Sequence, residues 1–268
     1  MESTDKKDAG ALLQRALLGA PGRTALFLDV DGTLIDIAPT PGAVHVAGSL
    51  LRDLESLQSI LGGALALLSG RSIETLDQLF APLALAAGGE HGAQIRPCAG
   101  GPVTRAPGAL MPDHVRAEID ALAASHDDLL VEHKGASVAL HFRARPELEQ
   151  ELSHAVASMI SNDRTDSLTV LPGKAVLEVK QTGFDKASAL RRLLAQGPFR
   201  DRVPVFIGDD VTDECAIAAA AAIGGLALSV GRAVPGAHAV FDSPAAVRRS
   251  LAAIVRASGN PTEKPIAS

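Results

Sequence analysis

The sequence contains no tryptophan and no tyrosine, and aromatic residues make up only 3% of its 268 residues. Ala, Leu and Val must therefore fill the core, because 47% of the residues are hydrophobic. This hydrophobic content, with 21% charged residues, excludes a compositionally disordered chain. The length is sufficient for two domains.

Cysteine is also scarce, with Cys98 and Cys215 as the two instances. They form no CxxC pair, and two cysteines exclude a framework of several disulfides. Two reduced thiols are typical of a cytoplasmic protein, which is the localisation we expect. The first residues, MESTDKKDAG, include early acidic side chains and argue against a secretory signal.

Long hydrophobic runs are missing as well. The most apolar stretch, AIAAAAAIGGLALSVG, is interrupted by a glycine pair and is shorter than the ~20 residues of a membrane helix. It predicts a helix followed by a buried strand. The net charge of −6, with scattered Lys and Arg, lacks the basic footprint of a nucleic-acid binder. We expect a monomer or weak homo-oligomer acting on a small molecule, with neither nucleic acid nor membrane as partner.

Short apolar runs alternate with helical patterns along most of the chain. The runs are TALFLDV, GALALLSG, LALAAGG, VPVFIGDD and GLALSVG. Strands of this kind are buried on both faces, and their alternation with helices predicts right-handed βαβ units and a parallel sheet. Helices are expected at residues 5–20, 43–60, 72–80, 185–196 and 213–222. The prediction is a doubly wound, Rossmann-like α/β core formed by residues 1–109 and 182–268.

A different pattern occupies residues 110–181. Two hairpins are expected, 131–143 turning near Lys134-Gly135 and 168–180 turning at Pro172-Gly173. Each hairpin follows a helix, the first over 112–125 and the second beginning at Pro146, a tolerated first-turn position. The order α-β-β-α-β-β predicts a small α+β domain inserted into the core.

The stretch LFLDVDGTL ends an apolar run in two carboxylates, Asp29 and Asp31. Residues two apart in a strand face the same way, so these side chains can converge at the strand's carboxyl end, where open α/β sheets bind ligands. Gly32 permits a tight turn there. An ordinary strand-to-turn junction is the alternative, but burying two carboxylates is costly unless something pairs with them.

Four motifs in order resemble the signatures of the haloacid-dehalogenase (HAD) phosphotransferase superfamily. They are DVDGT, SGR at 69–71, Lys186 in GFDKASAL, and GDDVTDE at 208–214. The resemblance implies that Asp29 is the nucleophile and Asp31 the general acid and base. It also implies that Ser69 and Lys186 bind phosphate, and that Mg²⁺ is held by Asp29, Asp209, Asp210 and the backbone carbonyl of Asp31. For Asp213 we leave open a role in orienting Lys186, in capping the next helix, or in contacting the metal.

The insertion corresponds to a type-two (C2) cap, and the chain is similar to the trehalose-6-phosphate phosphatase family over roughly residues 23–250. The similarity is carried by GGEHGAQIR, VEHKGASVALHFR and PGKAVLEVKQTGFDKASAL. It implies that Glu132, Lys134 and Glu178 bind the sugar, and that Arg71 and His91 contact phosphate, substrate or cap. Composition alone would favour a solvated, salt-bridged hairpin face. Two positions depart from the family pattern, His133 where Asp is expected and Ala187 where Gly is common.

These motifs predict Mg²⁺-dependent hydrolysis of trehalose 6-phosphate through an aspartyl-phosphate. One alternative keeps the chemistry but changes the substrate to another sugar phosphate, such as sucrose phosphate or mannosyl-phosphoglycerate. A non-catalytic sugar-phosphate sensor is a second alternative, although a binding module needs no nucleophile. A dehalogenase is disfavoured because that reaction does not need the acid/base group Asp31. The roles of His141 and Arg143 stay open.

Overall fold

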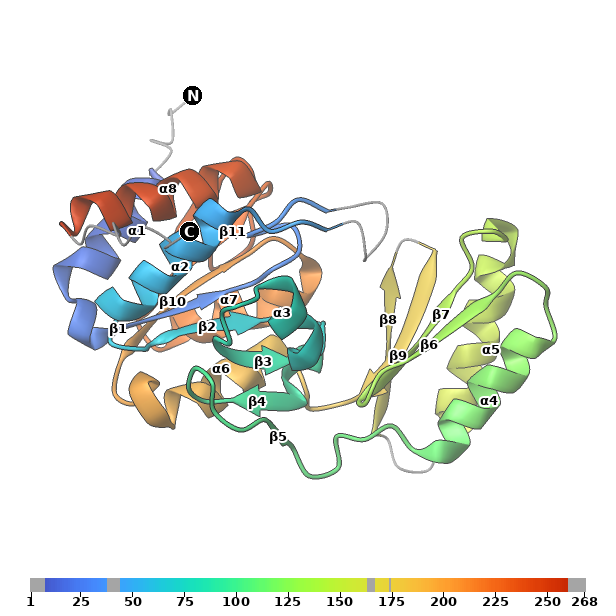
Figure 1. The fold of residues 1–268 in the computed structure, drawn as a ribbon. Helices are drawn as coiled ribbons and strands as arrows, with labels where there is room; N and C mark the ends of the chain where they lie inside the picture. Colours follow the sequence, from blue (N-terminus) through green and yellow to red (C-terminus); the bar gives the residue numbers. More distant parts are fainter. Residues whose placement is uncertain (1–7, 38–43, 163–166, 174, 260–268) are drawn as a thin grey trace, which may run out of the picture. The chain divides into compact units, whose positions relative to one another are not determined.

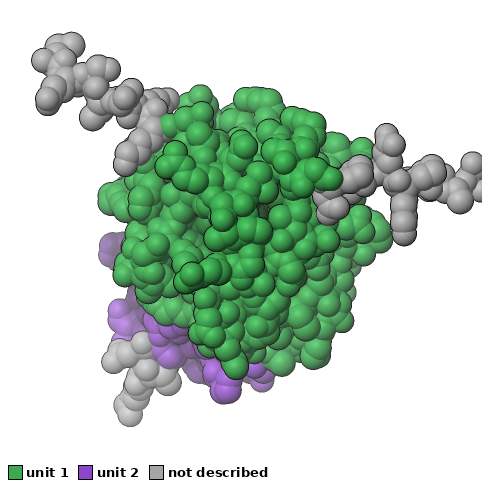
Figure 2. Space-filling model, turned by 90° about the vertical axis from the view of Figure 1, so that its left-hand side faces the viewer, with its two compact units in different colours: residues 1–104, 185–268 green, residues 105–184 purple. Residues whose placement is uncertain are grey.

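The computed structural model describes residues 8–37, 44–162, 167–173 and 175–259. The chain divides into a larger unit, Met1–Thr104 with Asp185–Ser268, and a smaller unit, Arg105–Phe184, which are coloured separately in Figure 2. The smaller unit extends beyond the predicted limits of 110 and 181. Its additional C-terminal residues are attached to it by hydrogen bonds, since Thr182 N donates to Ser167 O and Lys180 Nζ donates to Phe184 O.

The larger sheet has the strand order β12-β11-β10-β1-β2-β3-β4-β5 (Figure 1). Its strands are β1 (Thr24–Leu28), β2 (Leu65–Leu68), β3 (Ala86–Gly89), β4 (Gln94–Arg96), β5 (Thr104–Arg105), β10 (Val203–Gly208), β11 (Leu226–Val230) and β12 (Ala239–Phe241). The pairs from β12 to β3 are parallel, and β4 is antiparallel to β3. The predicted α/β fold with a largely parallel sheet is confirmed. Strands β4, β5 and β12 are short and were not predicted.

Helices cover the sheet of the larger unit. They are α1 (Ala9–Gly19), α2 (Gly48–Ile60), α3 (Ile73–Leu79), α6 (Lys186–Leu194), α7 (Val211–Ala222) and α8 (Pro244–Ala257). Helices α1 and α2 both pack against α8, and α6 packs against α7. All five residues of β1 are buried, as expected for a central strand covered on both sides. The core consists mainly of Leu, Ala, Val and Ile, with Phe27 stacked on Phe199.

Helices α1, α2 and α5 (Glu149–Asn162) begin several residues later than predicted, α7 begins earlier, and one helix was missed. Helix α5 starts after a 3₁₀ turn over Pro146–Leu148, and α7 starts at Val211 instead of residue 213. Helix α2 starts at Gly48, and its predicted first residue, 43, lies outside the described residues. Helix α1 starts at Ala9, and residues 5–7 of its predicted range also lie outside them. Helix α8 was not predicted, although the Ser243 side chain caps it and a proline follows at its first position. Among the described residues, no helix combines the length and apolar character that a bilayer crossing requires.

The smaller unit contains an antiparallel sheet in the order β6-β7-β9-β8. Its elements are α4 (Asp113–Ala124), β6 (Leu130–His133), β7 (Ser137–His141), α5 (Glu149–Asn162), β8 (Leu168–Gly173) and β9 (Val176–Gln181), in the predicted order. Residues Val138, Leu140, Leu177 and Val179 share one core cluster with apolar residues of α4 and α5. Since side chains alternate along a strand, the residues between them lie on the opposite face of the sheet.

Candidate active site

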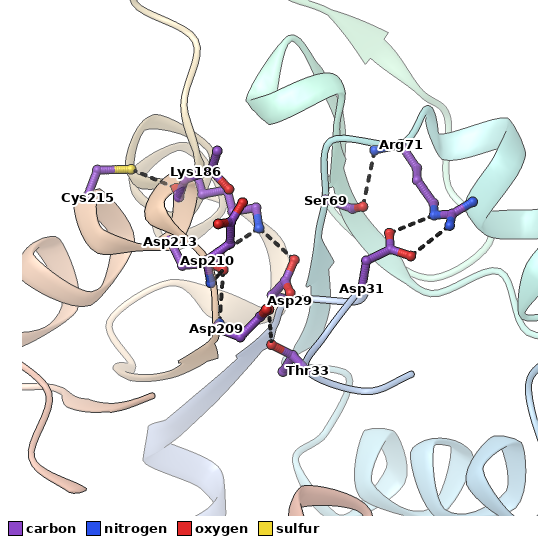
Figure 3. Close-up of polar contacts among 11 residues, drawn as sticks. Asp29, Asp31, Thr33, Ser69, Arg71, Lys186, Asp209, Asp210, Asp213 and Cys215 are labelled. Carbon is purple, nitrogen blue, oxygen red and sulfur yellow. Dashed lines mark hydrogen bonds and ion pairs between the residues drawn. The ribbon is translucent and has the colours of Figure 1, made fainter. Parts of the chain in front are cut away.

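The carboxyl ends of neighbouring parallel strands bring the predicted catalytic residues together. Strand β1 pairs with β10 in a register that sets Leu28 beside Ile207, so Asp29 and Asp209 follow the two strands at the same edge. Ser69 follows β2, which pairs with β1 on its other side. Lys186 begins α6, and Figure 3 shows its ammonium pointing towards Asp29 and Asp213. This is the edge at which open α/β sheets bind ligands.

Lys186 bridges two buried carboxylates. Its Nζ lies 2.6 Å from Asp29 Oδ1 and 2.6 Å from Asp213 Oδ1. All three residues are at most 4% exposed. Burial opposes the charge on Lys186, but the two carboxylates outweigh it and raise the pKa of Lys186 above its usual value. The lysine is therefore a permanent positive charge at the centre of the site.

The same burial raises the pKa of the carboxyl groups. It raises the pKa of Asp29 to about 6, although the charge of Lys186 acts in the opposite direction. The pKa of Asp213 is likewise raised to about 6 by burial, with repulsion from Asp29 acting in the same direction. Because like charges and burial penalise these carboxylates, the site favours additional positive charge.

Asp29 keeps one oxygen for a ligand. Its Oδ2 is buried and has no hydrogen-bond partner among the described residues. Carboxylate oxygens of Asp29, Asp209 and Asp213 lie within 4.8 Å of one another. A hard divalent cation takes oxygen ligands of this kind and would supply a partner for the unpaired oxygen. The arrangement therefore fits a metal ion.

Asp209 is held against the loop that follows β1. Thr33 Oγ1 donates to Asp209 Oδ1 at 3.0 Å, and burial raises the pKa of Asp209. Gly32 has a φ of +86°, and a Cβ at that position would overlap the Asp209 carboxylate. Glycine is thus required both by the backbone conformation and by the close approach of this side chain.

Asp213 orients the other groups. Its Oδ1 accepts from Lys186, while its Oδ2 accepts from the backbone N–H groups of Asp209 and Asp210 at 3.1 and 3.0 Å. Of the roles left open for Asp213, these contacts support two, the orientation of Lys186 and the capping of α7, since the bond from Asp210 N belongs to the capping box of that helix. Asp210, predicted as a metal ligand, is exposed at the N-cap of α7 and lies outside the acidic group formed by Asp29, Asp209 and Asp213.

Asp31 and Ser69 are both linked to Arg71. The guanidinium of Arg71 donates to Asp31 through Nε at 2.7 Å and through Nη2 at 2.6 Å, which is a bidentate ion pair. The backbone N–H of Arg71 donates to Ser69 Oγ at 3.1 Å (Figure 3). Ser69 is 2% exposed. The Asp31 side chain is 37% exposed, whereas Asp29 is 3% exposed. Asp31 is therefore the more accessible of the two β1-end carboxylates.

His91 lies beside the Ser69–Arg71 loop. Its backbone N–H donates to Ser69 O at 3.0 Å, and that of Glu90 donates to Arg71 O at 2.8 Å. His91 has a φ of +54°, a conformation rarely adopted by non-glycine residues. A Cβ at Gly70 would be 2.7 Å from His91 Nε2, so Gly70 leaves room for the imidazole. The structure thus brings His91 close to the loop of Ser69 and Arg71, a proximity that was not predicted.

The smaller unit carries its own polar cluster on the face of its sheet away from α4 and α5. Glu178 Oε1 accepts from Ser137 Oγ at 2.5 Å and from Lys134 Nζ at 3.2 Å. His141 Nε2 lies 3.1 Å from Glu132 Oε2. The predicted sugar-binding residues Glu132, Lys134 and Glu178 thus share one face of the smaller unit's sheet.

Sequence reasoning missed the contribution of two hydroxyl groups. Thr33 follows the Asp29-Asp31 motif, but its contact with Asp209 joins residues far apart in the chain. Ser137 was not singled out, because nothing in the sequence marks it as a neighbour of Glu178. Ser137 begins β7, and its closeness to Glu178 of β9 follows only from the pairing of these two strands.

The largely parallel sheet with acidic residues at its strand ends is the fold of HAD-type phosphatases. Residues 27–226 match the family model described as trehalose-phosphatase, and the chain belongs to that family. A probable trehalose-phosphate phosphatase of Sinorhizobium fredii is 40% identical over 222 residues, which cover 83% of each protein. The trehalose-6-phosphate phosphatase of Escherichia coli is 36% identical over 208 residues, covering 77% of each.

A solved structure shows the same fold. The C-terminal domain of a Candida albicans trehalose-6-phosphate phosphatase superimposes with a TM-score of 0.77 at 19% identity, over 93% of this chain and 97% of that one. A sequence identity of 19% is evidence for a shared fold and for nothing further. The fold agrees with the sequence resemblance to the HAD superfamily.

Proposed function

We propose that this protein hydrolyses trehalose 6-phosphate to trehalose and phosphate. The observation that carries the proposal is the buried Asp29–Lys186–Asp213 arrangement, in which Asp29 Oδ2 has no hydrogen-bond partner among the described residues. Membership of the trehalose-phosphatase family and the relatives' names support the substrate. The assembly suits phosphoryl transfer, where positioning and electrostatics supply most of the catalysis.

In the first step, a carboxylate oxygen of Asp29 attacks phosphorus, and the bond from phosphorus to the sugar oxygen breaks. Asp31 gives a proton to that leaving oxygen, so the sugar departs as a neutral alcohol. The product on the protein is an aspartyl-phosphate at Asp29. Ser69 and Lys186 bind the phosphoryl oxygens, and Lys186 stays charged because its pKa is raised.

In the second step, Asp31 removes a proton from water, whose oxygen attacks phosphorus. The bond between phosphorus and Asp29 breaks, which releases phosphate and restores the carboxylate. Asp31 thus returns to its starting protonation state, and a single group serves as acid and then as base. The bidentate contact from Arg71 suits this second step, because the ionised carboxylate that makes the contact is also the form that takes a proton from water.

We propose Mg²⁺ as the cofactor, held by Asp29 and Asp209, with Asp210 and the Asp31 backbone carbonyl as the remaining predicted ligands. The unpaired oxygen of Asp29 and the raised pKa values support a cation at this position. When bound, Mg²⁺ offsets the negative charge of the carboxylates and the phosphate. The protein positions these oxygens: Thr33 donates to the Asp209 carboxylate, and Asp213 accepts from the Asp209 backbone N–H.

We further propose that the smaller unit, with residues 110–181 as its predicted range, is the cap that selects the sugar. Glu132, Lys134 and Glu178 would bind hydroxyl groups of the glucose ring remote from phosphate. The contacts of Glu178 with Ser137 and Lys134 support this, because they leave a carboxylate with a defined direction. Arg71 and His91 would contact the phosphate or substrate from the other unit.

A phosphate-release panel tests the proposal. The protein is assayed with Mg²⁺ on trehalose 6-phosphate, sucrose phosphate, mannosyl-phosphoglycerate and glucose 6-phosphate, with and without EDTA. We expect the highest kcat/KM for trehalose 6-phosphate and loss of activity with EDTA. A higher kcat/KM for another substrate would disprove the sugar assignment. Binding of trehalose 6-phosphate without turnover of any substrate would indicate a sensor instead.

A further inference from the structure

Arg232 reaches the acidic loop from a different part of the chain. It lies between β11 and β12, just after Gly231, and its Nε donates to the backbone carbonyl of Asp209 at 3.0 Å. The same guanidinium contacts α7, where Nη2 lies 2.8 Å from Glu214 Oε1. One side chain therefore joins the residue after β10 to the helix that follows it.

The backbone of Arg232 is itself anchored. Ser229 Oγ, on the fully buried Ser229 of β11, donates to Arg232 O at 2.7 Å. The neighbouring Gly231 N–H donates to Phe241 O at 2.8 Å, which ties the loop to β12. A side chain attached to a fixed backbone holds its partners more closely than one on a free loop, because less conformational entropy is lost on contact.

With Arg232 included, Asp209 is held at three points. Asp213 accepts the Asp209 N–H, Thr33 donates to its carboxylate, and Arg232 donates to its carbonyl. The first two contacts come from residues already assigned to the site. The contact from Arg232 is made to the carbonyl of the peptide between Asp209 and Asp210, so it restrains the backbone from which the Asp209 side chain projects.

We propose that Arg232 is a positioning residue that sets Asp209 for metal binding. The inference rests on the proposed function, in which Asp209 is a ligand of Mg²⁺. Groups that orient the ligands of a metal commonly change its affinity when they are removed, by about 10-fold to 100-fold. Arg232 acts through Asp209 and is not itself a ligand, because a guanidinium has no acceptor atom.

Arginine suits this position better than lysine. A carbonyl and a carboxylate accept from two nitrogens of one planar group, Nε and Nη2, whose relative directions are fixed. A lysine ammonium can reach one of the two partners but cannot reproduce the pair of directions. Glu214 provides the second attachment, so its removal should loosen Arg232 without removing the contact with Asp209.

The test compares Arg232→Met, Arg232→Lys and Glu214→Gln with Arg248→Met. Arg248 is a matched control because it also donates to a backbone carbonyl, that of Leu34, and to a carboxylate, that of Asp36. Mg²⁺ is titrated into each full-length, metal-free variant by calorimetry, without substrate. The Mg²⁺ dependence of phosphate release and the melting temperature of the metal-free protein are measured beside it.

We expect Arg232→Met to weaken Mg²⁺ binding by about 10-fold, with Arg232→Lys recovering part of it and Glu214→Gln showing a smaller loss. At saturating Mg²⁺, kcat should return to within about 2-fold of the unsubstituted protein, because the ligands themselves are intact. Arg248→Met should bind Mg²⁺ as the unsubstituted protein does.

The inference is overturned if Arg232→Met and Arg248→Met bind Mg²⁺ equally well. It is also overturned if Arg232→Met loses kcat at saturating Mg²⁺ while its Mg²⁺ affinity is unchanged. Failure of the proposed function has a different signature. An unsubstituted protein that binds Mg²⁺ without releasing phosphate from trehalose 6-phosphate contradicts the function, while the titrations still support Arg232.

Discussion

Arg71 holds Asp31 with two hydrogen bonds, Nε to Oδ2 at 2.7 Å and Nη2 to Oδ1 at 2.6 Å. The pair joins the end of β1 to the loop after β2, and the Arg71 side chain is largely covered, at 17% exposure. Asp31 therefore has a fixed direction before any substrate arrives. Proton transfer requires the Asp31 carboxyl group to lie close to the reacting oxygen, and the protonated form that acts as the acid cannot accept from Arg71 through both oxygens.

Replacing Arg71 should impair proton transfer more than phosphate binding. We expect Arg71→Met to lower kcat for trehalose 6-phosphate by about 100-fold, at the lower end of general acid–base contributions. Arg71→Lys should recover little, because an ammonium cannot make the bidentate contact. Phosphate release is measured on trehalose 6-phosphate and on p-nitrophenyl phosphate, whose leaving group needs no protonation.

The leaving groups separate the two roles of Arg71. A defect that is much smaller with p-nitrophenyl phosphate supports an effect on Asp31. Equal defects on both substrates would contradict it and would favour direct binding of phosphate by Arg71. Arg248→Met serves as control, since Arg248 contacts Leu34 and Asp36 instead of Asp31.

Asp29→Asn should remove turnover with little change of fold. The amide keeps the shape of the side chain and an acceptor for Lys186 but is a poor nucleophile, so we expect a loss of roughly 10⁴-fold or more. Acid-quenched protein, digested and analysed by mass spectrometry, should carry phosphate on the Asp29 peptide in the unsubstituted enzyme alone. Asp36→Asn, which changes an exposed carboxylate, should retain activity. Parent-rate phosphate release from Asp29→Asn would refute the nucleophile assignment.

The stability of the metal-free protein should fall as pH rises from about 4 to about 6. Burial raises the pKa of Asp29 and of Asp213 from 3.8 to about 6 in the folded state, so the folded protein binds more protons in that interval. The stabilisation is complete below the unfolded pKa and is lost as pH passes the folded pKa. Its size is on the order of a few kcal/mol. Urea unfolding in EDTA at several pH values measures it.

Asp213→Asn is the matched variant for this measurement. It removes one of the two titrating groups while keeping an oxygen for Lys186, so its stability should decline less steeply over the same interval. At pH 7, Mg²⁺ should stabilise the unsubstituted protein, because it binds the ionised carboxylates of the folded state. Identical pH slopes for the two proteins would show that Asp213 does not titrate there.

Substitutions of Glu178 and Ser137 should weaken recognition of the sugar, seen in KM, without changing phosphoryl transfer. Ser137→Ala removes the donor 2.5 Å from Glu178 Oε1, and a lost hydrogen bond of about 1 kcal/mol predicts a roughly 5-fold higher KM for trehalose 6-phosphate. Glu178→Gln should raise KM further. Activity on p-nitrophenyl phosphate, which carries no sugar, should change in neither variant.

The controls for this experiment are Ser161→Ala and Glu151→Gln in α5. Ser161 donates to the carbonyl of Ala157 within the helix, and Glu151 pairs with His126. Both should leave KM unchanged. If Ser137→Ala affects p-nitrophenyl phosphate as strongly as trehalose 6-phosphate, the smaller unit does not select the sugar through Glu178.

Much of the fold could be predicted because local patterns and tertiary environment agree. The run ALFL within β1 has no polar side chain, so burial on both faces is its favourable state. The start of α6 is likewise marked by its N-cap Asp185, whereas α7 was predicted from residue 213 although its N-cap is Asp210. The short strands β4 and β12 were missed because three residues carry too little periodicity to be distinguished from a loop.

The sequence by itself determined the chemical groups and their strand-end positions, since Asp29, Ser69 and Asp209 each follow an apolar run that has to be buried. Tertiary structure alone decided which of these groups share partners. Lys186 lies between Asp29 and Asp213, and Arg232 contacts Asp209, through pairings of strands and helices far apart in the chain. Such contacts depend on register and packing, because a side chain's neighbours across a sheet are set by strand order and not by sequence distance.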